Sequence, residues 1–106
     1  MPAFDTAITP TSVAPADTNN ATLFTAQTDS SVLVDVANIG AASISVRVGI
    51  TPSGGSVHWK VYDLAIGPGD SALSIGPWFL QANDAITVRT DTANNAVFSI
   101  TGVRST

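Results

Sequence analysis

Apolar and polar residues alternate through most of the chain after residue 20, and this alternation restricts the fold more than any other feature. From residue 43 to residue 50, isoleucine or valine fills every even position, while serine, arginine and glycine fill the odd positions. Successive side chains of a β-strand point to opposite faces, so a period of two predicts a strand buried on one face. Residues 32–36 repeat the pattern, and Leu33 on the opposite face predicts that this strand is covered on both sides.

Seven such segments follow one another, separated by turn signals. Glycine, asparagine and proline between the segments favour chain reversal, and no segment has helical periodicity. The pattern predicts an all-β fold, an antiparallel β-sandwich of either immunoglobulin-like or jelly-roll type. An eighth strand, from residues 77–80 or from the first 20 residues, would allow the jelly roll. The expected strands are residues 22–26, 32–36, 44–50, 57–62, 72–75, 86–88 and 96–100.

The first 20 residues differ in composition from the rest. They contain three prolines and isolated large apolar residues at Phe4, Ile8 and Val13, without regular spacing. We therefore expect residues 1–20 to form an extended N-terminal arm and residues 21–106 to form the sandwich domain. The arm is either a disordered tail or a segment whose three apolar residues dock on a neighbouring subunit.

The chain carries unusually little charge. Charged residues make up 11% of it, where about 25% is ordinary, and the formal net charge is −4. Four scattered cations do not form a phosphate-binding surface, so we expect no nucleic-acid partner. No apolar run approaches the roughly 20 residues that span a bilayer, so we expect no membrane partner either. Neutral outward positions, filled largely by Ser, Thr and Ala, favour an assembled protein in which outer faces are buried against neighbours.

The residues offer little for catalysis or metal binding. The chain has no cysteine, one histidine, and no G-x-S-x-G motif, so we expect no catalytic residues, no cofactor and no enzymatic activity. Four aspartates flank turns, but no calcium-binding loop pattern surrounds them. We expect these carboxylates to stabilise their turns through hydrogen bonds to the backbone, with no metal bound. They are Asp63, Asp70, Asp84 and Asp91.

The aromatic residues give the candidate interfaces. Period two places Trp59 on one strand face with Val57 and Val61, which predicts a core position. The opposite face would then carry His58, Lys60 and Tyr62, a candidate protein interface with Arg47 nearby.

Residues 77–80 form a second aromatic segment. They either cross between the sheets at a corner, which the pattern favours, or let Trp78 or Phe79 protrude toward a partner.

The order of these motifs resembles a family of short virion structural proteins of tailed bacteriophages. The resemblance covers about residues 22–102. It consists of Leu-Phe-Thr at 23–25, the strand at 32–38, Ile-Ser-Val-Arg-Val at 44–48, Tyr-Asp-Leu-Ala-Ile-Gly-Pro-Gly-Asp at 62–70, Gly-Pro-Trp-Phe-Leu-Gln-Ala-Asn-Asp at 76–84, Ile-Thr-Val-Arg at 86–89, and Val-Phe-Ser-Ile-Thr-Gly at 97–102. Each motif alone is a strand followed by a turn, and their order within one short chain carries the likeness.

The resemblance implies a β-sandwich built into a virus particle, with no catalytic residues. The leading hypothesis is a decoration (cement) protein on the capsid surface, acting as a trimer that bridges subunits of the major capsid protein. Alternatives are a tail, baseplate or fibre component, and a host-glycan-binding module with Trp78 and Tyr62 as stacking platforms. The interface candidates are Phe4, Ile8, Val13, His58, Lys60, Tyr62, Trp78 and Phe79.

Overall fold

The computed structural model describes residues 4–105, which contain nine strands and no helix. Accordingly, the described residues include no helix long and apolar enough to cross a membrane. All seven expected strands are present. The strands are β1 (Phe4–Ala7), β2 (Thr11–Val13), β3 (Ala21–Thr25), β4 (Ser30–Asn38), β5 (Ile44–Thr51), β6 (His58–Ile66), β7 (Ser71–Leu80), β8 (Ala85–Thr90) and β9 (Ala96–Ser105).

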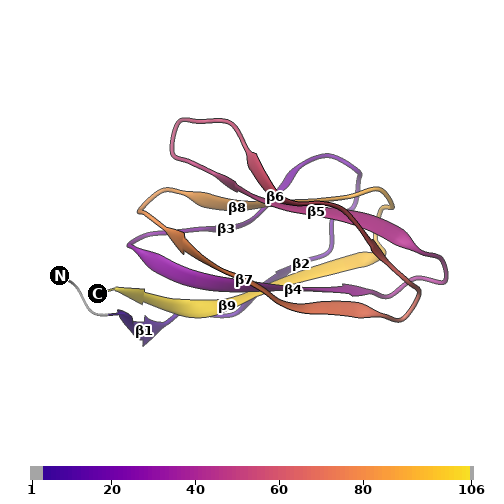
Figure 1. Cartoon of the computed structure of the whole chain (residues 1–106), viewed down its shortest axis with the longest axis horizontal. Helices are drawn as coiled ribbons and strands as arrows, with labels where there is room; N and C mark the ends of the chain where they lie inside the picture. Colours follow the sequence, from indigo (N-terminus) through magenta and orange to yellow (C-terminus); the bar gives the residue numbers. More distant parts are fainter. Residues whose placement is uncertain (1–3, 106) are drawn as a thin grey trace.

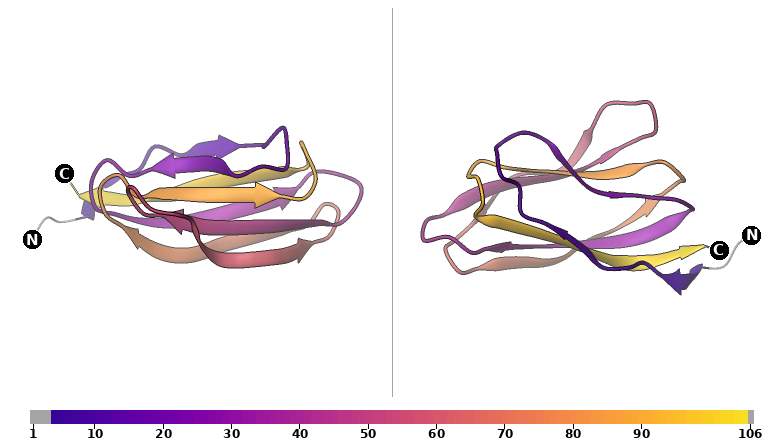
Figure 2. Two further views of the ribbon diagram at one scale, coloured as in Figure 1. Left: turned by 90° about the horizontal axis from the view of Figure 1, so that it is seen from above. Right: turned by 180° about the vertical axis from the view of Figure 1, so that it is seen from behind.

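The strands form two antiparallel sheets that pack face to face. One sheet has the order β1-β9-β4-β7, with β2 also paired to β9, and the other has the order β3-β8-β5-β6. Figure 1 shows β3, β5, β6 and β8 in one layer and β2, β4, β7 and β9 in the other, and Figure 2 shows the same layers from above and behind. The prediction of an antiparallel β-sandwich is confirmed.

The order of pairing identifies the sandwich as a jelly roll. β5 pairs with β6, β4 with β7, β3 with β8, and β2 with β9, so each pair encloses the previous one along the chain. β9 also pairs with β4, and β8 with β5, so the nested ribbon is rolled into two layers, as in a jelly roll. Each layer has four strand positions, and β1 and β2 together fill one of them. The alternative between immunoglobulin-like and jelly-roll topology is therefore resolved in favour of the jelly roll.

The start of the chain supplies the eighth strand position. β1 and β2 both pair with β9, so residues 4–13 belong to the sheet, and residues 14–20 connect the two layers. Residues 4–13 were expected to belong to an arm that ends at residue 20, but they form part of the sandwich. Pro10 interrupts the strand between β1 and β2, since proline cannot donate a ladder hydrogen bond. Residues 1–3 of the expected arm lie outside the described residues.

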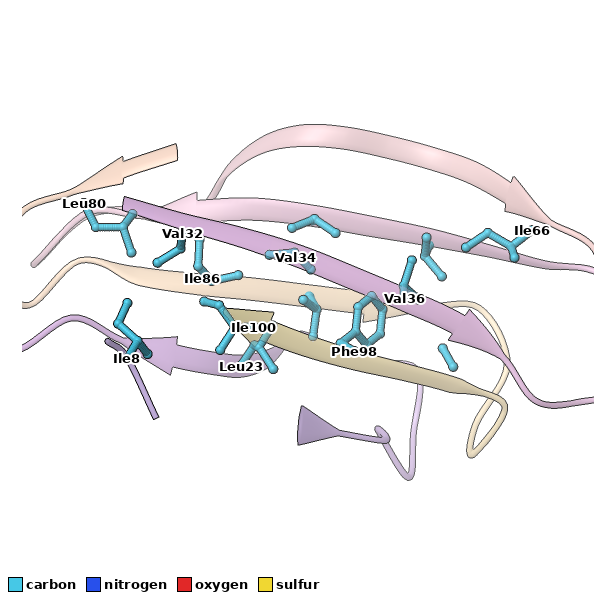
Figure 3. Packing of buried hydrophobic residues seen from close by; sticks show 14 of the residues in the cluster. Ile8, Leu23, Val32, Val34, Val36, Ile66, Leu80, Ile86, Phe98 and Ile100 are labelled. Atoms are coloured by element: carbon cyan, nitrogen blue, oxygen red, sulfur yellow. The ribbon is translucent and has the colours of Figure 1, made fainter. Parts of the chain in front are cut away.

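The core lies between the two sheets and is built from the alternating positions (Figure 3). In β4 every even position from Ser30 to Asn38 is buried and every odd position is half-buried, as the sequence pattern predicts. Val, Ile, Leu and Phe side chains from both sheets interlock there. The largest fully buried side chains include Phe98, Ile44, Ile86 and Ile100.

Candidate functional site

Strand β6 carries two bulges that rearrange its outward side chains. Val61 pairs with Val48 and Trp59 pairs with Gly49, so β6 advances two residues while β5 advances one. The extra residue reverses the side-chain alternation, and Trp59 lies on the outer face of the sheet while Val61 packs against the core. The prediction that Trp59 is a core residue is therefore wrong. A second bulge between Val46 and Val48 contains Asp63, whose φ is 55°.

Trp59 and Tyr62 both lie close to the Arg47 guanidinium on this outer face. The guanidinium carbon is 3.9 Å from the centroid of the Tyr62 ring and 5.9 Å from that of Trp59. Such cation–π contacts hold a planar guanidinium in place. The sequence placed Tyr62 opposite Trp59, but both rings contact the same arginine. The expectation that Arg47 lies near Tyr62 is confirmed.

Asp63 completes this arrangement. Arg47 donates from Nε to Asp63 Oδ1 at 2.8 Å and from Nη2 to Oδ2 at 3.4 Å. This hydrogen bond lowers the pKa of the Asp63 carboxyl and raises the pKa of Arg47. Asp63 was expected to stabilise a turn, whereas it lies in a bulge and forms an ion pair.

Arg89 brings a second guanidinium to the same place. It is the direct cross-strand partner of Arg47, and its Nε donates to the carbonyl oxygen of Thr18 at 2.9 Å. Both arginines line a shallow hollow of about 270 Å³ together with Asp63 and Asp91. We refer to Arg47, Trp59, Tyr62, Asp63 and Arg89 as the Arg47 cluster. Sequence reasoning missed Arg89 and Trp59, although Gly49 within a strand is a known signal of a bulge or a close cross-strand partner.

His58 and Lys60 flank Trp59 on β6, and His58 pairs with Ile50, which packs against the core. Both His58 and Lys60 are exposed on β6, which is one of the two edge strands of its sheet. Tyr62 is 61% exposed despite its contact with Arg47. The structure therefore keeps all three predicted residues of this strip accessible.

A second exposed surface lies on the other sheet. Phe79 is 71% exposed, and it shares a cross-strand row with Val103 because both pair with Ser31. Phe79 and Phe4 also line one hollow of about 400 Å³ at an end of the sandwich, so the structure brings these two predicted residues together. We refer to Phe4, Phe79 and Val103 as the apolar face, since all three are exposed and lie near Phe79.

Residues 77–80 form the end of β7 rather than a corner between the sheets. β7 pairs with β4 along this segment, with Val32 opposite Trp78 and Ser30 opposite Leu80. Trp78 is half-buried and packs against the core, whereas Phe79 points outward. The favoured corner is thus wrong, and Phe79 is the protruding residue.

Two predicted interface residues lie against the core. Ile8 is 6% exposed and belongs to the hydrophobic cluster shown in Figure 3, and Val13 packs against that cluster. The segment that contains them pairs with β9, and both side chains face the core. Ile8 is therefore a core residue and not a contact for a partner.

Of the four turn aspartates, Asp84 stabilises its own turn as predicted, whereas the backbone bond of Asp91 reaches a distant strand. Asp84 accepts hydrogen bonds from the backbone N–H groups of Ser53 and Gln81, and Asp91 accepts one from that of Ser45. Within residues 4–105 there is no group of three or more metal-ligating side chains placed to hold an ion.

Comparisons with known proteins give structural matches only. No protein-family model matches the chain, and no curated protein does. One solved structure, described as the acidic stable capsid of Helicobacter pylori bacteriophage KHP30, contains a chain with a TM-score of 0.64 and 13% identity. The alignment covers 97% of this protein and 91% of that chain, so the two are of nearly equal length.

A second match is a chain of the T13 IBDV (infectious bursal disease virus) viral particle. Its TM-score is 0.57 at 12% identity, and the alignment covers 95% of this protein but 32% of that chain. At such low identity the likeness concerns the fold. The protein thus has an antiparallel β fold similar to that of chains found in structures of viral particles.

Proposed function

We propose that this protein is a non-enzymatic structural component of a bacteriophage particle, a decoration or cement protein on the outer surface of the capsid. In this role it would bind as a trimer and bridge subunits of the major capsid protein. Many modest contacts, repeated at symmetry-equivalent positions, would together stabilise the head.

One observation carries the proposal: the nearly end-to-end match to a chain in a phage capsid structure. In the IBDV particle the similar fold is about a third of a longer chain, whereas in the phage capsid structure it covers 91% of the matched chain. A match over nearly all of a phage chain of similar length supports an added component better than a shell-forming subunit. The low charge of the chain also supports burial against neighbours.

The apolar face is the proposed contact with neighbouring subunits. Monomeric proteins seldom expose several large apolar side chains together without a binding role. Phe79 is 71% exposed and Val103 39%, and the residue between them in their cross-strand row is Ser31. Trp78 would support Phe79 from the inner side of the same strand.

Location and capsid stability test this proposal. Immunogold labelling of intact particles should place the protein on the head, and capsids that lack it should lose resistance to heat or low salt. Native mass spectrometry of the purified protein should give the mass of a trimer. Labelling on the tail, together with unchanged capsid stability, would contradict the decoration role and favour the tail alternative.

A further inference from the structure

We propose that the Arg47 cluster is a docking surface for an acidic protein surface, and that its arginines bind carboxylates of the neighbouring subunit in the particle. The proposal rests on the proposed function, because it names the chemistry of the partner in that assembly. It concerns the outer face of the β3-β8-β5-β6 sheet and is separate from the apolar face on the other sheet.

The cluster is organised before any partner arrives. Arg47 is held by two hydrogen bonds to Asp63 and by the Tyr62 ring at 3.9 Å, and its side chain is 23% exposed. A side chain that is already fixed loses little rotamer freedom on binding. Arginine, tyrosine and tryptophan are also the residues most enriched among the strong contacts of protein interfaces. The cluster combines all three within contact distance.

The arginines retain unused N–H donors, and such donors would bind an oxygen acceptor. Arg47 uses Nε and Nη2 for Asp63, and Arg89 uses Nε for the carbonyl oxygen of Thr18. Within residues 4–105, Nη1 of Arg47 and both Nη atoms of Arg89 donate no hydrogen bond. Because Arg47 and Arg89 are cross-strand partners, these two like charges lie side by side, and an incoming carboxylate would reduce their repulsion.

The charge distribution selects an acidic partner. Strands β5, β6 and β8 carry three of the four cations of the chain, namely Arg47, Lys60 and Arg89. The carboxylates that line the hollow beside them are Asp63 and Asp91. The rest of the molecule has one cation and six carboxylates. These three strands therefore carry a net positive charge within a protein whose net charge is −4, which favours an acidic partner.

The same geometry argues against two other ligands. Three cations beside two carboxylates give too little charge for a phosphate backbone. A sugar would stack on an open aromatic face, but the Arg47 guanidinium covers one face of the Tyr62 ring. A protein carboxylate is therefore the ligand that the observations favour.

Lys60 makes a direct test possible. It is the single lysine of the chain and is exposed on β6 beside Trp59. Treating intact particles with a carbodiimide joins amines to carboxylates that are in contact. Mass spectrometry should then find Lys60 linked to an aspartate or glutamate of the shell protein. A protein that lies on the particle with Lys60 unlinked, or linked only to a second copy of itself, would overturn the proposal.

Charge-removing variants give the quantitative test. Arg47→Gln and Arg89→Gln should each weaken binding to capsids depleted of this protein by about 10-fold or more. Arg104→Gln is the matched control, because it removes the same charge from β9 of the other sheet and should bind like the wild type. Circular dichroism checks that each variant is folded. Equal binding of all three variants would refute the docking surface and leave the decoration role intact.

The two proposals can fail separately. If the wild-type protein does not bind depleted capsids, the decoration role fails, and an immobilised polyglutamate peptide then tests the docking surface alone. Retention of the wild type but not of Arg47→Gln, with Arg104→Gln retained, would support the surface, and equal retention would refute it. Selective binding to glycans that Arg47→Gln abolishes, with shell binding unaffected, would also overturn the proposal.

Discussion

Asp63 shows how one residue can combine a backbone requirement with an electrostatic one. Its φ of 55° lies in the left-handed region, which aspartate and asparagine tolerate better than most residues. The bulge that this conformation creates turns the carboxylate toward Arg47 on the neighbouring strand. The backbone geometry and the ion pair therefore depend on the same position.

The Arg47–Asp63 ion pair should make the thermal stability of the protein depend on pH. Arg47 lowers the pKa of Asp63 in the folded state, so the pair stabilises the protein above the ordinary aspartate pKa of about 3.9. That contribution is lost as the pH falls through the lower folded-state pKa. Thermal unfolding of the wild type and of Asp63→Asn, which keeps the backbone preference, should differ at pH 7 and converge below that pKa. A difference that stays constant down to pH 2 would contradict the assignment.

Ile8 is the residue at which the arm and the core meet. Replacing it with alanine removes buried methyl groups and leaves a space beneath β9, which should lower the free energy of unfolding by about 2–4 kcal/mol. Urea denaturation measures this change. Thr9→Ala, at the exposed neighbouring position, should stay within about 0.5 kcal/mol of the wild type. Similar values for the two variants would mean that this segment does not contribute to the core.

At the scale of the element, β9 connects more of the sheet than any other strand. It pairs with β1, β2 and β4, and Gly102 lies across from Val32 in the β4 pairing. A side chain at Gly102 would overlap the carbonyl oxygen of Ser31 and come within 2.9 Å of Val32 Cα. These are backbone atoms, so the two strands would have to separate.

Gly102→Ala should therefore be strongly destabilising. We expect a loss of about 3 kcal/mol, at the upper end of overpacking effects, because no flexible side chain can yield. Gly55→Ala is the matched control, since its new methyl group would make ordinary contact with Pro52 at 3.5 Å. Chemical denaturation of both variants would test this difference. If Gly102→Ala is as stable as Gly55→Ala, the close approach of β4 and β9 is not as described.

At the scale of the whole molecule, the nested pairing brings the two ends of the described chain together. Phe4 in β1 is the cross-strand partner of Ser105 in β9, and Figure 1 shows β1 beside the end of β9 at one end of the sandwich. The opposite point of the nested ribbon is the exposed loop between β5 and β6. All strand pairs except β5 with β6 therefore join residues that are distant in sequence, which is typical of slowly folding β proteins.

This arrangement predicts that a circular permutant will fold. A chain that begins at Gly55, ends at Gly54 and joins the original ends through a short Gly-Ser linker keeps every strand pair. Its far-ultraviolet circular dichroism and its tryptophan fluorescence should match those of the wild type. Two linker lengths guard against strain at the new junction. Failure of both to fold would contradict the nested topology.

Local alternation was sufficient to predict the seven strands, the two-layer class and most of the core. In a strand such as β4, the sequence alone shows which face is buried, because side-chain direction alternates with every residue. The turn role of Asp84 was likewise predictable, since a carboxylate next to a turn reaches nearby backbone N–H groups.

Only the tertiary structure determined the features that depend on pairing with another strand. Trp59 lies on the outer face, and not in the core as predicted, because Gly49 opposite it accommodates a bulge. Nothing within β6 marks which residue is the extra one. Ile8 entered the core because β9 offers an unpaired edge to an otherwise irregular segment. The jelly roll itself, and with it the Arg47 cluster, arises from pairings between distant strands, whose register the sequence of one strand alone does not encode.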